Sequence, residues 1–149
     1  MLGSVGVAVA ASIFKPSDAG GQYNAYFKSL NKILRDNNID SPTLVIDLDR
    51  LDRNIDRVVD SVAKGGNKTY RIVTKSIPSP ELVNYVAERA NTNALMVFHR
   101  PFLQALTIIN PQSDILMGKP MTVTGAATFY QQHEGKFSPQ KQLQWLIDT

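Results

Sequence analysis

Short apolar runs rich in β-branched residues alternate with amphipathic helical patterns at intervals of roughly 20 to 30 residues along most of this chain. Such alternation is typical of parallel βαβ units, because a parallel strand needs a crossover across the sheet, which is usually helical and right-handed. We therefore expect an α/β fold. The apolar runs predict strands over residues 43–47, 70–76, 94–99, 114–119 and 142–149.

Apolar residues at spacings of three and four positions predict the helices between these strands. The clearest pattern includes Leu51, Ile55 and Val58, and it ends at the pair Gly65-Gly66, which stops a helix readily. The helical patterns cover residues 26–34, 48–62, 80–91, 101–110 and 123–132.

An open doubly wound sheet and a (β/α)8 TIM barrel both fit this alternation. The chain contains neither the Gly-x-Gly-x-x-Gly fingerprint of a dinucleotide-binding unit nor a P-loop. A complete barrel needs about 250 residues, and the 149 residues of this sequence end at the last predicted strand. We expect residues 22–149 to form a partial TIM barrel with about five parallel strands.

Residues 1–20 form an apolar, small-residue stretch followed by a polar linker. The stretch is too short to span a bilayer as a helix, so we expect no stable membrane span. It resembles the apolar core of a signal peptide, although no Lys or Arg precedes Lys15. Either it is the second half of a twin-arginine export signal, which places the protein in the periplasm, or it is an N-terminal helix of a cytoplasmic protein.

Composition excludes several classes of function. The 16 basic and 13 acidic residues are mixed along the chain, with no basic stripe, which argues against a nucleic-acid partner. The absence of cysteine excludes disulfides, thiolate metal sites and a cysteine nucleophile. The two histidines, His99 and His133, lack the spacing of metal ligands, so we expect no metal site in this chain.

Polar residues follow the predicted strands at their carboxyl ends, which is where ligands bind in parallel α/β folds. Lys75 is our candidate cofactor anchor, and strand alternation places Arg71 on the same face. Arg71 either contacts a cofactor ring or pairs with Asp47. His99 is either an acid–base group or a hydrogen-bonded residue at the edge of the core. The residues at these strand ends are Asp47, Lys75, His99, Lys119 and Asp148.

Two runs resemble the start of the fold-type III pyridoxal-phosphate proteins, in the alanine racemase N-terminal domain superfamily. They are SPTLVIDLDRLDRNI at residues 41–55 and RIVTKS at residues 71–76. The nearest branch is that of D-threonine aldolase and D-serine dehydratase, and the resemblance covers about residues 40–149. Carried over by position, it implies that Lys75 is the Schiff-base lysine. Our further candidates for cofactor binding are Arg71, on the same strand face as Lys75, and Asp47 and His99 at the strand ends. The histidines that this branch carries around its lysine are missing here.

The resemblance implies the N-terminal part of a pyridoxal-phosphate-dependent enzyme of aldolase, dehydratase or racemase type. Its substrates would be D-amino or 3-hydroxy-amino acids, and the full-length protein would be a homodimer. Phosphate-binding loops, a β-rich second domain and the divalent-metal ligands of the lyase branch would lie beyond Thr149, so this chain is too short to be active alone. The alternatives are a non-catalytic pyridoxal-phosphate carrier and an inactive barrel fragment.

Overall fold

The computed structural model describes residues 20–133 and 135–147, in two compact units that meet in the sequence at Val45 and Ile46. The signal-like stretch and its predicted role in export lie outside the described residues. The first unit contains α2 (Ala25–Asp36). Asn24 caps this helix, because its side chain accepts a hydrogen bond of 3.0 Å from the amide of Phe27.

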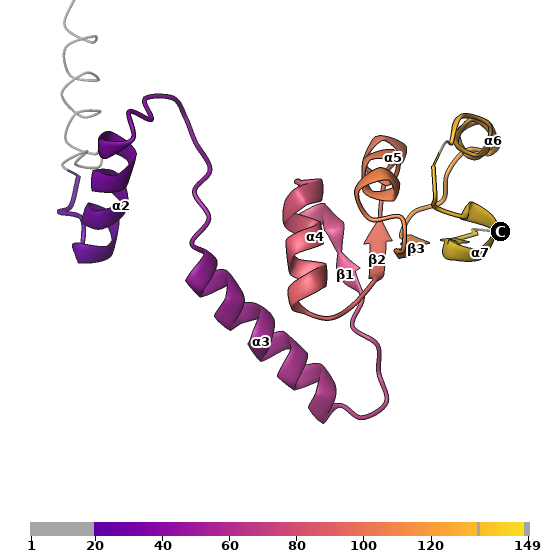
Figure 1. Ribbon diagram of the computed structural model, residues 1–149, viewed down its shortest axis with the longest axis horizontal. Helices are drawn as coiled ribbons and strands as arrows, with labels where there is room; N and C mark the ends of the chain where they lie inside the picture. Colours follow the sequence, from indigo (N-terminus) through magenta and orange to yellow (C-terminus); the bar gives the residue numbers. More distant parts are fainter. Residues whose placement is uncertain (1–19, 134, 148–149) are drawn as a thin grey trace, which may run out of the picture. The chain divides into compact units, whose positions relative to one another are not determined.

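In the second unit, helices and strands alternate along the chain, as Figure 1 shows from α3 onward. The strands form one parallel sheet in the order β1-β2-β3-β4, which confirms the predicted α/β class and the parallel pairing. Its strands are β1 (Ile72–Val73), β2 (Ala94–Val97), β3 (Asp114–Met117) and β4 (Leu143–Trp145). Its helices are α3 (Leu48–Lys64), α4 (Pro80–Arg89), α5 (Arg100–Ile109), α6 (Val123–Gln132) and α7 (Pro139–Gln142).

The helices bury one face of this sheet. Neighbouring strands place Ile72, Leu95, Ile115 and Leu143 side by side. These residues join a buried cluster with apolar side chains of α3, α4, α5 and α6. The next positions along the strands point the other way, and there the side chains are half-buried or exposed; they are Val73, Met96, Leu116 and Gln144.

Helix α3 attaches to α4 through polar side chains as well as apolar ones. Ile55 is the residue of α3 that is buried. The hydroxyl of Tyr85 donates a hydrogen bond of 2.8 Å to Asp52, and Arg89 donates one of 2.9 Å to Asp56. The α3–α4 contact therefore combines apolar packing with polar pairs between Tyr85 and Arg89 of α4 and aspartates of α3.

The first predicted strand, over residues 43–47, is wrong, because this run belongs to no strand of the sheet. Leu44 is 81% exposed, and Val45 and Ile46 are exposed as well. Asp47 is the N-cap of α3, since its carboxylate accepts a hydrogen bond of 3.0 Å from the amide of Arg50. A β-branched composition suits a strand, but only pairing with a neighbour makes one.

The other predicted strands exist and are shorter than expected. A single 3-10 turn over Thr74–Ser76 ends β1 early. Helix α5 begins at Arg100 with His99 as its N-cap, so β2 ends before His99. Near the carboxyl end, α7 occupies residues predicted as loop and strand. The part of the chain that the structure describes forms a sheet of four strands instead of about five.

Gln142 fixes the start of β4 with one side-chain amide. Its Nε2 donates hydrogen bonds to the carbonyl oxygens of Pro111 at 2.9 Å and Ser113 at 3.0 Å. Its Oε1 accepts a hydrogen bond of 2.7 Å from the amide of Ser138. The turn before β4 is thereby attached to the loop before β3.

We predict that substitutions on the two faces of the sheet differ in cost. Leu95→Ala should lower the free energy of unfolding by about 2–5 kcal/mol, because it leaves a cavity in the buried cluster. Leu116→Ala, on the less buried face of the next strand, should cost less than about 2 kcal/mol. Urea unfolding followed by circular dichroism measures both values. Equal losses would contradict burial on one face.

We also predict that alkaline pH weakens the contact between α3 and α4. The hydrogen bond to Asp52 raises the pKa of Tyr85 above its ordinary value of 10.0. The neutral hydroxyl is the donor, so its stabilisation is complete below pH 10 and is lost as the pH rises through the raised pKa. The measurement is the fall in the urea midpoint of unfolding between neutral and alkaline pH, and Tyr85→Phe should make this fall smaller. Tyr23→Phe, at an exposed tyrosine of the first unit, should retain it.

Candidate functional site

Lys75 lies directly after β1, in the 3-10 turn that replaces the end of the predicted strand. Thr74 turns the chain here, because its buried hydroxyl donates a hydrogen bond of 3.0 Å to the carbonyl of Met96 on β2. The amide of Ile77 then closes the turn on the carbonyl of Thr74 at 3.0 Å. The lysine is thus at the carboxyl end of the sheet, as expected, but on a turn instead of a strand.

The amine of Lys75 lies over an aromatic ring, with its Nζ 5.0 Å from the centroid of Phe98. A cation in this position is attracted to the face of the ring. Both residues line a small pocket of about 240 Å³ at the carboxyl ends of β1 and β2. The lining residues are Thr74, Lys75, Pro78, Phe98, His99 and Phe102.

His99 belongs to the same pocket, at the start of α5. Its imidazole makes no side-chain capping bond and stacks on the ring of Phe102, with the centroids 5.8 Å apart and the planes within 10°. The residue is exposed. Lys75 and His99 therefore line one pocket, together with the aromatic rings of Phe98 and Phe102.

Arg71 lies at the opposite, amino end of the sheet. Its guanidinium donates hydrogen bonds of 2.9 Å to the carbonyls of Leu95 and Asp114, and one of 2.7 Å to the Asp114 carboxylate. The same carboxylate accepts a hydrogen bond of 2.7 Å from Gln144 on β4. One arginine thereby connects the chain just before β1 with β2, β3 and, through Asp114, β4.

Asp47 is placed by its capping role at the start of α3, where it also forms an ion pair of 3.4 Å with Arg50. The ion pair that the structure gives Arg71 is with Asp114 and not with Asp47. Lys119 is exposed beyond β3, and Asp148 lies outside the described residues. Of the predicted site residues, only Lys75 and His99 share the pocket.

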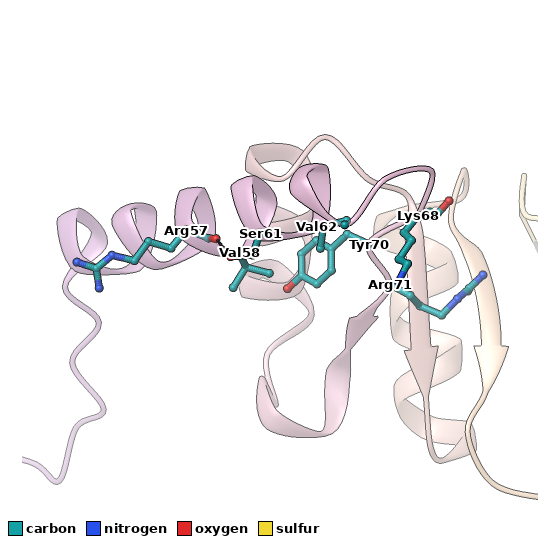
Figure 2. Close-up of a pocket in the computed structure, with 9 residues that line it drawn as sticks. Arg57, Val58, Ser61, Val62, Lys68, Tyr70 and Arg71 are labelled. Carbon is teal, nitrogen blue, oxygen red and sulfur yellow. Dashed lines mark hydrogen bonds between the residues drawn. The ribbon is translucent and has the colours of Figure 1, made fainter.

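A larger cavity of about 530 Å³ lies between α3 and the chain that leads into β1. Figure 2 shows that its cations do not converge: Arg57 extends along α3 away from Lys68 and Arg71. The guanidinium of Arg71 is already held by Asp114. This cavity is more open than the pocket at Lys75 and its cations do not meet, so the smaller pocket is the better candidate for chemistry.

Sequence reasoning missed the aromatic part of the site. Phe98 belongs to the predicted apolar strand over residues 94–99 and Phe102 to the predicted helix over residues 101–110, where aromatic residues usually fill a core. The sequence position of these two residues could have indicated their role, because both lie within four residues of His99, at the end of a predicted strand. Aromatic residues beside a strand end can face a ligand as well as a core.

No helix within residues 20–133 and 135–147 has both the length and the apolar character needed to cross a membrane. Within the same residues, no cluster of three or more histidine, aspartate or glutamate side chains is arranged to bind a metal ion. Comparison of the chain with known protein families, with curated proteins and with solved structures finds no match. The candidate site therefore stands on its own geometry.

We predict that Arg71 supports the sheet. Arg71→Lys should lower the free energy of unfolding by about 1–3 kcal/mol, because lysine cannot reproduce a fork that reaches three acceptors. Arg57→Lys, an exposed arginine of α3, is the matched control and should stay within about 0.5 kcal/mol of the wild type. Urea unfolding of both variants checks this, and similar values for the two would exclude a special role for Arg71.

Proposed function

We propose that this chain is the N-terminal part of a pyridoxal-phosphate-dependent enzyme that acts on D-amino or 3-hydroxy-amino acids. The reaction would be of aldolase, dehydratase or racemase type, with Lys75 as the lysine that holds the cofactor. The observation that carries the proposal is the position of the Lys75 amine, exposed at the carboxyl end of a parallel sheet and beside a pocket with aromatic walls.

The proposal includes a fold, the first part of a (β/α)8 TIM barrel. A doubly wound sheet carries helices on both faces, whereas a barrel carries them on the outside only. In this chain the buried strand residues of the apolar cluster all belong to one face. The other face carries Val73, Met96 and Leu116, which would point into the barrel.

The residues of the pocket fit one part of the cofactor. Lys75 supplies a primary amine for its aldehyde, and Phe98 and Phe102 supply flat apolar surfaces for its ring. Lys75 is the only lysine or arginine among the described residues of the pocket wall, so these residues offer no second cation for the phosphate. At about 240 Å³ the pocket is also smaller than the roughly 300–1,000 Å³ of typical ligand sites. This chain would therefore form one wall of the site.

The residues of this pocket would bind the cofactor and orient it. The Lys75 amine acts as the nucleophile toward a carbonyl carbon, which requires its unprotonated form. His99 also lines the pocket, and its imidazole makes no capping hydrogen bond to α5. The imidazole can therefore donate a hydrogen bond to a ligand or accept one from it. Thr74 is committed to the carbonyl of Met96 and serves the turn. When bound, the pyridine ring of the cofactor supplies an electron sink for a carbanion at the amino-acid α-carbon.

Reductive trapping tests the proposal. The chain is incubated with pyridoxal phosphate at a concentration below saturation of its surface lysines, reduced with borohydride, and analysed by peptide mass spectrometry. We expect the label to be concentrated on Lys75, because its amine borders a pocket that receives the ring. Lys75→Ala should remove most of the label, and Lys119→Ala, at an exposed lysine beyond β3, should not. An even distribution over the exposed lysines would refute the proposal.

A further inference from the structure

The ring of Phe98 lies close to two residues from different strand ends, Lys75 after β1 and Gly118 after β3. The Lys75 amine lies 5.0 Å from the ring centroid. A Cβ atom added to Gly118 would lie 2.6 Å from Cε1 and 2.8 Å from Cζ of the same ring. The ring therefore occupies the space that any side chain at position 118 would need.

The glycine is required by the ring and not by the backbone. The φ angle of Gly118 lies outside the left-handed region, so an alanine could adopt the same backbone conformation. The added Cβ would also lie 2.9 Å from Cγ of Met96, so it would meet a second side chain as well as the ring. Separations below 3.0 Å are not tolerated by real Cβ atoms, so a side chain at position 118 must displace the ring.

We propose that Phe98 and Gly118 are positioning residues for the Lys75 amine: Gly118 leaves room for the ring of Phe98, and the ring holds the amine beside the pocket. The naming of Lys75 as the reactive amine rests on the function proposed above. The positioning itself rests on two observations: the amine of Lys75 lies over the ring of Phe98, and the atoms of Phe98 and Met96 fill the space beside Gly118.

The physical basis is the attraction between a cation and the face of an aromatic ring, which is strongest when the contact is partly shielded from water. Phe98 is half-buried and Lys75 is exposed, so without this contact the four-carbon lysine stem would sample many rotamers in solvent. The ring reduces that freedom and keeps Nζ within reach of a ligand in the pocket.

A purely structural role for Phe98 predicts different behaviour. If the ring only filled space, a leucine of similar hydrophobicity would replace it with little consequence for Lys75. A tyrosine, which keeps the ring, would be no better than leucine. The two substitutions Phe98→Leu and Phe98→Tyr therefore separate positioning of the amine from packing.

The first measurement is competitive acetylation of lysines with an activated acetyl ester at low conversion, with peptide mass spectrometry. The readout is the ratio of acetylation at Lys75 to acetylation at Lys141, an exposed lysine of α7. We expect Phe98→Leu to raise this ratio about 2- to 5-fold, because the amine is no longer held against the ring. Phe98→Tyr should keep the wild-type ratio.

Gly118→Ala is the second arm, and it should raise the same ratio because the ring is displaced. Gly21→Ala is its matched control, since a Cβ at Gly21 would meet no atom within 4 Å. Circular dichroism verifies that each variant is folded. If Gly118→Ala fails to fold, the pair Phe98→Leu and Phe98→Tyr decides alone.

The second measurement is capture of pyridoxal phosphate by borohydride reduction, in the same variants. Positioning predicts opposite changes for Phe98→Leu: acetylation of Lys75 rises, and capture of pyridoxal phosphate on Lys75 falls. General unfolding would raise both.

An unchanged acetylation ratio in Phe98→Leu overturns the positioning role, and so does a Phe98→Tyr variant that behaves like Phe98→Leu. Both conclusions hold whether or not the chain captures pyridoxal phosphate. Wild-type protein that shows the acetylation effect but no selective capture overturns the proposed function and leaves the positioning role in place.

Discussion

Burial of one face of a parallel sheet against helices is the constraint on which the rest of the second unit depends. Ile72, Leu95 and Ile115 lie side by side and are almost completely buried, so the pairing of β1, β2 and β3 cannot slip by one residue without exposing them. This fixed register brings the three strand ends to the same edge. Lys75, Phe98 and Gly118 meet there because each follows its strand at a comparable distance.

The two ends of the sheet are built from different interactions. At the amino end, Arg71 and Asp114 bind each other and the neighbouring backbone through charge-assisted hydrogen bonds, which hold their geometry closely. At the carboxyl end, Lys75 and the rings of Phe98 and Phe102 make contacts that are weaker and less directional. The stronger end maintains the sheet, and the weaker end leaves an amine accessible to a ligand.

Local patterns in the sequence predicted the elements whose stability is local or whose burial is periodic. Helices α3 and α4 followed from the spacing of their apolar residues. The run at 43–47 failed because strand formation depends on a partner edge that composition does not reveal. The partner of Arg71 lies 43 positions away and could not be identified without the fold. The contact between Phe98 and Gly118 was invisible for the same reason, since a glycine at a strand end has several common explanations.

The amide of Gln142 makes the attachment of β4, one of the two edge strands, depend on a single side chain. One side chain satisfies two carbonyl oxygens and one backbone amide, and only a group with both donors and an acceptor can do so. Deamidation to glutamate would exchange the donors for a negative oxygen facing the carbonyls of Pro111 and Ser113. The turn would then be repelled from the loop it is attached to, and β4 would separate first. Loss of β4 would uncover β3 as a new sheet edge, to which other chains can add.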